Sequence, residues 1–133
     1  NILTEMAHHR GMAGTVIDGI NRDVALCREL NYSIFSRGHW MRTGKGRIQL
    51  AGLQVPVQIG GVNVHPGDLL RGDADGVVVI PRAMQAQVLQ YAEEITEQEN
   101  AIRAGIRAGL RMDEARRRYH YHHLQNPGYD KLR

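Results

Sequence analysis

The stretch GGVNVHPGDLLRGDADGVVVIP, residues 60–81, decides the fold expected for this chain of 133 residues. Short apolar runs alternate there with glycine, proline and aspartate, the residues that favour tight turns. The runs predict strands at 62–64, 69–70 and 77–80. Because such strands follow one another with only a turn between them, we expect antiparallel or mixed pairing rather than βαβ units.

The sequence before this stretch continues the pattern of short elements. Residues 2–10 predict a helix that is closed by glycine, and residues 23–30 predict a second helix. Asp18 and Gly19 are expected to form a turn. Further strands are expected at 15–17, 33–36, 47–50 and 55–59.

After Pro81 the apolar residues recur at steps of three and four as far as Leu110, which predicts one long helix. Gly105 and Gly109 lie near its end. They are either two helix-weakening residues or the mark of a close helix crossing or a helix end. A short basic helix is expected at 113–121, and Asn126-Pro127-Gly128 begins a tail.

Composition argues against several classes of protein. The net charge of +3 is spread along the chain, and only residues 103–118 are locally basic, so a nucleic-acid partner is not expected. Cys27 is the single cysteine, which excludes an intrachain disulfide and suits a cytoplasmic location. The sequence has no apolar run long enough to span a membrane.

Four aspartates beside glycines could be mistaken for a metal site. The segment around Asp73 and Asp75 resembles part of a calcium loop, but arginines occupy the first and last ligand positions. We interpret Asp68 and Asp75 as turn residues whose side chains bind local backbone amides, and Asp18 likewise as a turn residue. Asp73 is either another structural residue or part of a site.

The segment GMAGTVIDGINRD, residues 11–23, places Arg22 and Asp23 where a strand gives way to a helix. Arginine offers a fixed fork of charged donors to a small oxyanion, and a carboxylate is a hard ligand for Mg²⁺ or Mn²⁺. The same pair also suits a simple ion pair at a helix start, where negative charge is favourable. The dipeptide alone leaves both interpretations open.

Together, residues 11–23 and 60–81 resemble the RraA-like family, which includes the 4-hydroxy-4-methyl-2-oxoglutarate aldolases. The resemblance covers about residues 1–110. It implies an α/β fold of the layered β/β/α swivelling-domain type with a long C-terminal helix. We assign residues 1–112 to the C-terminal part of the family domain and residues 113–133 to a C-terminal helix and tail.

The resemblance also implies an activity. The family residue that matches Arg22 contacts the keto oxygen of pyruvate, and the one that matches Asp23 ligates a divalent metal, Mg²⁺ or Mn²⁺. The expected enzyme is a class II aldolase that cleaves 4-hydroxy-4-methyl-2-oxoglutarate or 4-carboxy-4-hydroxy-2-oxoadipate to pyruvate, with oxaloacetate decarboxylation as a side activity. Arg22 is then the catalytic and substrate-binding residue, and Asp23 is the metal ligand.

Glu99 is a further candidate because it falls within the apolar stripe of the long helix, beside Ile95, Ile102 and Ile106. A carboxylate on a packing face is costly unless it is paired or used. It either bends out to water, pairs with Arg103, or has a functional role. Family members form trimers or dimers of trimers in which a C-terminal glutamate reaches a neighbouring subunit's metal site, and we transfer this catalytic role to Glu99 as a hypothesis.

Two alternatives to the aldolase remain open at this stage. The family's namesake is a non-enzymatic protein that binds and inhibits ribonuclease E. Regulators of that type can lack the acidic residue beside the arginine, so Asp23 favours the enzyme. The family's N-terminal portion, whose loop binds the substrate carboxylate, has no counterpart in this sequence, and a polypeptide without it could be inactive.

Overall fold

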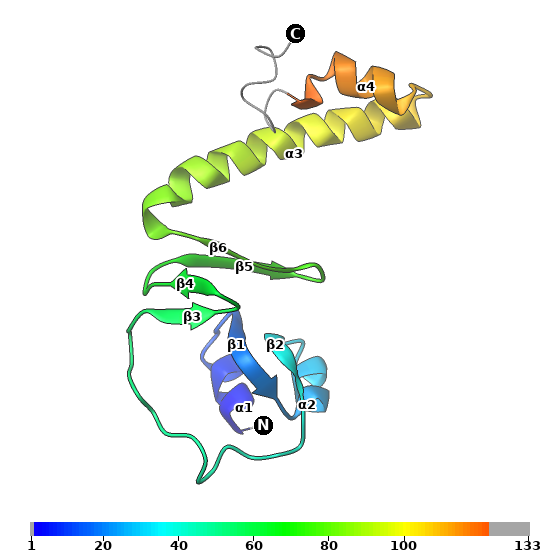
Figure 1. Ribbon diagram of the computed structural model, residues 1–133. Coiled ribbons are helices and arrows are strands. Elements are labelled where there is room, and N and C mark those ends of the chain that lie inside the picture. The colour runs from blue at the N-terminus through cyan, green and yellow to red at the C-terminus, as the bar shows by residue number, and fades with distance from the viewer. Residues whose placement is uncertain (1, 123–133) are drawn as a thin grey trace. The chain divides into compact units, whose positions relative to one another are not determined.

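The computed structural model describes residues 2–122, and the chain forms two compact units, residues 1–82 and 83–133 (Figure 1). The second unit contains the helices α3 (Gln85–Arg107) and α4 (Met112–Arg118), preceded by a 3₁₀ turn, η1 (Arg82–Met84). The elements of the first unit are, in order, α1 (Ile2–His9), β1 (Gly14–Asn21), α2 (Val24–Glu29), β2 (Ser33–His39), β3 (Val57–Ile59), β4 (Val62–Val64), β5 (Leu69–Asp73) and β6 (Gly76–Ile80).

The first two strands pair in parallel, and α2 makes the connection between them. Parallel strands need such a crossover, so β1, α2 and β2 form a βαβ unit. The antiparallel or mixed pairing expected for the closely spaced later strands is confirmed, because β3 pairs with β4 and β5 with β6 in antiparallel fashion. The expected turn at Asp18 and Gly19 is wrong, because both residues lie within β1, where the register shifts between Ile17 and Ile20.

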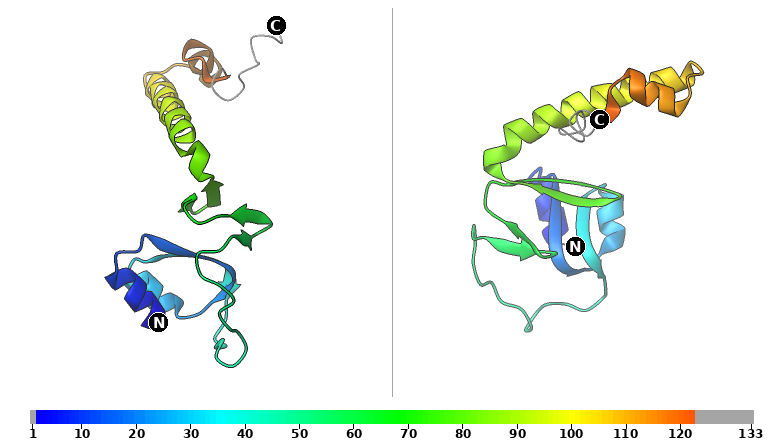
Figure 2. Two further views of the ribbon diagram at one scale, coloured as in Figure 1. Left: turned by 90° about the vertical axis from the view of Figure 1, so that its left-hand side faces the viewer. Right: turned by 45° about the horizontal axis from the view of Figure 1, so that its top comes forward.

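The short helix α2 ends where the chain must turn back to start β2. Asn31 adopts a left-handed conformation with φ 51°, and the Tyr32 amide donates to the Cys27 carbonyl at 2.8 Å. This is the hydrogen-bond pattern of a Schellman motif, in which asparagine can replace the usual glycine. It brings Cys27 and Tyr32 into the interior, where both are buried. Figure 2 shows α1 and α2 on the same side of the β1–β2 pair.

Two antiparallel hairpins follow. Gly60 and Gly61 form the two-residue turn between β3 and β4. Their φ values of 58° and 84° are positive, and this backbone conformation favours glycine at both positions. The strand expected at 47–50 is not formed, and residues 40–56 contain no helix or strand. Ile48 and Leu50 are 80% and 74% exposed there, so their side chains have no packing that would stabilise a strand.

The long helix expected after Pro81 is confirmed as α3, and its end explains both glycines. Gly109 has φ 94°, and the Leu110 amide donates to the Gly105 carbonyl at 3.0 Å, which is again a Schellman motif. A side chain at Gly105 would meet Leu110 and the ring of Tyr119, so this glycine allows close packing. The glycines therefore mark both a helix end, at Gly109, and a close packing of helices, at Gly105.

The expected tail that begins at residues 126–128 lies outside the described residues. The same is true of the part of segment 113–133 that follows residue 122. The boundary at residue 112 between family domain and tail stays a prediction. None of the helices within residues 2–122 is both long and apolar enough to cross a membrane.

Candidate functional site

Arg22 and Asp23 occupy the junction between β1 and α2, as the sequence predicts. Asp23 is the N-cap residue of α2 in position, but its φ and ψ of 63° and 33° are left-handed, and its side chain makes no capping hydrogen bond. A left-handed residue other than glycine stores strain, and such residues cluster at functional sites. The carboxylate thus does not cap the helix that begins after it.

The two side chains form the ion pair that was one of the two interpretations of this dipeptide. Arg22 Nε lies 3.5 Å from Asp23 Oδ2, and the side chains are 50% and 30% exposed. An exposed pair of this kind contributes little to stability, typically ~0–1 kcal/mol. The ion pair therefore does not by itself explain why both residues are placed here.

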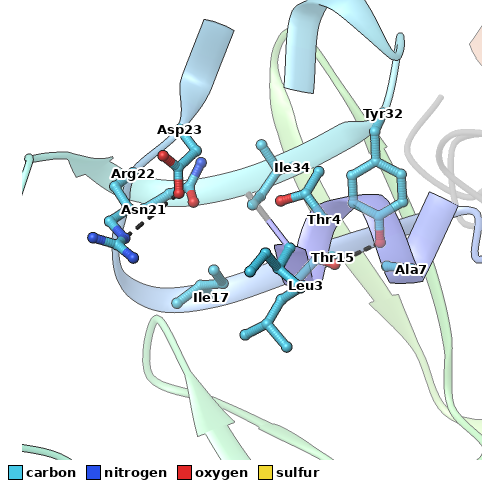
Figure 3. A pocket seen from close by; sticks show the side chains of 11 residues that line it. Leu3, Thr4, Ala7, Thr15, Ile17, Asn21, Arg22, Asp23, Tyr32 and Ile34 are labelled. Carbon is cyan, nitrogen blue, oxygen red and sulfur yellow. Dashed lines mark hydrogen bonds and ion pairs between the residues drawn. The ribbon is translucent and has the colours of Figure 1, made fainter. Parts of the chain in front are cut away.

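Both side chains border a cavity of about 310 Å³ in the first unit (Figure 3). Asn21, Arg22 and Asp23 gather at one end of it, and Ile17 and Ile34 lie beyond them. The remaining lining comes from the helix α1 and from the start of each strand: Ile2, Leu3, Thr4, Ala7, Thr15 and Tyr32.

The other end of the cavity carries a pair of hydroxyl groups. Thr15 Oγ1 and the Tyr32 hydroxyl oxygen are 2.7 Å apart, which is a hydrogen bond between β1 and the residue that precedes β2. Apolar side chains separate this pair from Arg22 and Asp23. The cavity is therefore charged at one end, apolar along its length and hydroxyl-bearing at the other, as suits a small polar organic acid.

The donor atoms at the charged end suit a hard divalent ion. The Asp23 carboxylate and the Asn21 carboxamide supply oxygen atoms, and no group of three or more His, Cys, Asp or Glu residues gathers anywhere within residues 2–122. An ion here would complete its shell with water and substrate oxygens. Mg²⁺ is commonly bound in this sparse manner, and the residues present thus fit the expected metal.

Asp18 has a structural role that differs from the expected turn. Its carboxylate accepts hydrogen bonds from Arg37 Nε on β2 and from the Gly60 amide, the latter at 3.2 Å. The Arg37 hydrogen bond, aided by that of Gly60, lowers the pKa of Asp18 below its ordinary value. The residue joins three segments and is not available as a ligand of the cavity.

Asp68 and Asp73 are turn residues. Asp68 accepts from the His65 amide at 2.8 Å and the Arg82 amide at 2.9 Å, and these two bonds lower its pKa. The prediction for Asp68 is confirmed. Asp75 lies in the turn between β5 and β6, as expected, but the hydrogen bond there is made by the Asp73 carboxylate, which accepts from the Asp75 amide at 2.9 Å. Neither Asp68 nor Asp73 lines the cavity of Arg22 and Asp23.

Glu99 lies on α3, where Arg103 Nη2 donates to its carboxylate at 2.7 Å. The salt bridge to Arg103 was one of the alternatives given by the sequence. The Glu99 side chain is 34% exposed, so it lies at the edge of the packing face rather than within it. Its role at another subunit's site stays a prediction.

Sequence reasoning missed four polar residues of the cavity: Thr4, Asn21, Thr15 and Tyr32. Asn21 could have been found, because it immediately precedes the Arg22–Asp23 pair. Thr15 and Tyr32 gave no such signal, since 17 positions separate them and only the parallel pairing brings them together.

Comparison with known proteins identifies the group to which this chain belongs. The family model RraA-like, described as Aldolase/RraA, matches residues 1–79, which is more than half of the chain. This protein is a member of the RraA-like family. The resemblance drawn from residues 11–23 and 60–81 is therefore confirmed.

Individual relatives agree with this assignment. A protein of Halalkalibacterium halodurans named "Putative 4-hydroxy-4-methyl-2-oxoglutarate aldolase" is 44% identical over 89 residues, which cover 67% of this chain and 42% of the relative. Protein DlpA of Legionella pneumophila is 36% identical over 121 residues, which cover 91% of this chain and 20% of that protein. This RraA-like chain thus spans less than half the length of either relative.

A solved structure confirms the predicted fold class. The crystal structure of an uncharacterized protein from Pseudomonas syringae pv. tomato matches with a TM-score of 0.84 and 40% sequence identity. The match covers 86% of this chain and 57% of the other chain. The mixed α/β architecture with its long C-terminal helix is therefore that of this RraA-like relative.

Proposed function

We propose that this protein is a divalent-metal-dependent class II aldolase that cleaves 4-hydroxy-4-methyl-2-oxoglutarate, or a related 4-hydroxy-2-oxo acid, to pyruvate. Membership of the RraA-like family and the names of its relatives support a carbon–carbon lyase. The observation that carries the proposal is the placement of Arg22 and Asp23 together at the charged end of one cavity. Oxaloacetate decarboxylation is the side activity that the same chemistry would give.

Arg22 has the central part in the proposed reaction. Removal of the C4 hydroxyl proton and cleavage of the C3–C4 bond leave the electron pair on the pyruvate fragment as an enolate. The guanidinium of Arg22 donates hydrogen bonds to the oxygen where this negative charge develops, and fixed donors of this kind contribute most in a site with little water. Protonation of C3 then gives pyruvate.

Asp23 would hold the metal, and the Asn21 carboxamide lines the same end of the cavity. A bound Mg²⁺ or Mn²⁺ supplies Lewis-acid polarisation of the 2-oxo group. The apolar side chains of Ile17 and Ile34 line the cavity next to its Arg22 end. The hydroxyl pair at the other end offers donors and acceptors to a polar group of the substrate.

Coupled detection of pyruvate tests the proposal. The purified protein is incubated with 4-hydroxy-4-methyl-2-oxoglutarate and Mg²⁺ or Mn²⁺, and in parallel with excess chelator. We expect pyruvate release with the metal and none with the chelator. Full release in chelator, or trapping of a substrate adduct by borohydride at Lys45 or Lys131, would replace the metal mechanism by Schiff-base chemistry.

A further inference from the structure

The backbone of Asn21 is held at the end of the β1–β2 pair. Asn21 is the last residue of β1, where it pairs with His39 of β2, and its carbonyl accepts from the Trp40 amide at 2.9 Å. Arg22 and Asp23 lie beyond this last pair. The side chain of Asn21 therefore leaves the sheet from a defined point at the charged end of the cavity.

A buried thiol fixes the side chain as well. Asn21 Nδ2 donates to Cys27 Sγ at 4.0 Å, and Thr4 Oγ1 lies 4.0 Å from the same sulfur atom. Cys27 is 3% exposed and stands at the meeting point of α1, β1 and α2. Since sulfur is a weak acceptor, this contact orients the carboxamide more than it stabilises the fold.

The orientation has a consequence for the oxygen of the carboxamide. A carboxamide has its nitrogen and oxygen on opposite sides, so the nitrogen directed to Cys27 turns Oδ1 away from the thiol. Figure 3 shows the side chains of Asn21, Arg22 and Asp23 at the same end of the cavity, with Arg22 paired to Asp23. A neutral oxygen and a charged oxygen thus lie at the same end of one cavity.

We propose that Asn21 Oδ1 is a second protein ligand of the divalent-cation site, beside Asp23, and that Cys27 positions it. The inference rests on the proposed metal dependence and adds a residue to the site. Carboxamide oxygens are ordinary ligands of hard divalent ions. Cys27 contributes as a positioning residue, in the way that outer partners fix the ligands of a metal site.

Titration of the full chain with Mn²⁺ alone, followed by electron paramagnetic resonance, tests this assignment without an activity assay. Asn21→Val removes the oxygen, and Asn21→Asp keeps an oxygen but removes the N–H donor to Cys27. We expect Asn21→Val to weaken Mn²⁺ binding by at least the roughly 10- to 100-fold seen when outer partners of a site are lost. Asn21→Asp should bind Mn²⁺ at least as tightly as the wild type.

Three further measurements separate the outcomes. Cys27→Ala should weaken Mn²⁺ binding by about 10-fold, the low end of the range for an outer partner. Thr15→Val, at the hydroxyl end of the same cavity, is the matched control and should leave Mn²⁺ binding unchanged. Water-proton relaxation of the Mn²⁺ complex should show an additional bound water in Asn21→Val, because water replaces the lost ligand.

If the wild type binds Mn²⁺ and Asn21→Val binds it equally well, the ligand role is overturned while the proposed function stands. If Asn21→Asp loses Mn²⁺ binding as Asn21→Val does, the amide N–H is what matters and Asn21 has only a structural role. If the wild type itself does not bind Mn²⁺, the metal dependence of the proposed function fails and this inference fails with it.

Discussion

The end of β1 and the hairpins after residue 56 both carry aspartates, but the two regions use them differently. In the hairpins, Asp68 and Asp73 accept hydrogen bonds from nearby backbone amides and so complete turns. At the end of β1, Asp23 does not cap its helix and faces a cavity together with Arg22. The same residue type thus maintains the fold in one region and provides candidate chemistry in the other.

The largest expected effect is on activity, and it comes from Arg22→Lys. Lysine keeps the charge but loses the fork of donors, so kcat/KM should fall by on the order of 2–4 kcal/mol in transition-state stabilisation. The unfolding midpoint should stay close to that of the wild type, because the Arg22 side chain is half exposed.

Arg37→Lys is the matched control for this variant. Arg37 pairs with Asp18 on the neighbouring strand and does not line the cavity of Arg22 and Asp23. It should lower stability and leave kcat/KM nearly unchanged. Normal turnover by Arg22→Lys would reduce Arg22 to a structural ion-pair partner and remove the contrast between the two regions.

The next effect is on stability, in the hairpin region. Gly72 of β5 lies against the ring of Phe35 on β2, and a methyl group at this position would collide with the ring. Gly72→Ala should therefore lower the free energy of unfolding by about 1–3 kcal/mol, as overpacked positions do. Denaturant unfolding measures the change.

Gly19→Ala provides the comparison, because a methyl group there meets only Ile17 at 3.6 Å, an ordinary contact. Its effect should stay within about 0.5 kcal/mol. Phe35→Leu should restore part of the stability lost in Gly72→Ala. Equal stability of Gly72→Ala and the wild type would show that β5 and β2 do not pack as described.

A smaller effect concerns acid stability and Asp68. Two backbone hydrogen bonds, from His65 and Arg82, lower the pKa of Asp68 in the folded protein. Its contribution to stability is present above the unfolded-state pKa of about 3.9 and is lost as the pH falls through the lower folded-state pKa. In Asp68→Asn that dependence disappears, so stability should fall less steeply between about pH 4 and pH 2.

Chemical unfolding at a series of pH values measures this slope. The Asp68→Asn variant should also be less stable than the wild type near neutral pH, because a neutral amide is a weaker acceptor for the two amides than a carboxylate. An unchanged slope in the acid range would mean that the hydrogen bonds of Asp68 do not depend on its charge.

The smallest effect on stability is expected for Glu99→Gln. Its salt bridge to Arg103 is a partly exposed pair four residues apart on one helix, and such pairs contribute only ~0.3–0.5 kcal/mol. If Glu99 serves a neighbouring subunit's site as we predict, turnover should nevertheless fall while the mass of the assembly stays the same. The assembly expected from the family is a homotrimer or a hexamer.

Glu97→Gln is the control for this variant, because Glu97 is exposed on the same helix. It should affect neither turnover nor assembly. Light scattering measures the assembly of both variants, and pyruvate release measures their turnover. Unaltered turnover in Glu99→Gln would show that Glu99 has no catalytic role and serves only in its salt bridge with Arg103.

Features that depend on a few adjacent residues were predictable from the sequence. The period of the apolar residues after Pro81 predicted α3, and the paired glycines at 60 and 61 predicted the turn between β3 and β4. The junction at Arg22 and Asp23 was found for the same reason, because a strand pattern there changes to a helix pattern within a few residues.

Features that depend on distant partners were not predictable in this way. Residues 47–50 have the composition of a strand, but no neighbouring strand binds their backbone groups, so they remain irregular. The parallel partner of β1 was missed because strand pairing is decided by packing and not by the strand's own residues. The bond from the Asp75 amide to the Asp73 carboxylate was not predicted, because both residues suit a turn equally well.

The sequence by itself determined the family of this protein, the order of most of its helices and strands, and the candidate pair Arg22 and Asp23. Local propensity, apolar period and turn chemistry act over a few residues, and all of them can be read directly from the chain. Only the tertiary structure decided which polar groups share the cavity with that pair. The parallel alignment of β1 with β2 brings Thr15 to Tyr32, and the packing of α2 brings Cys27 to Asn21.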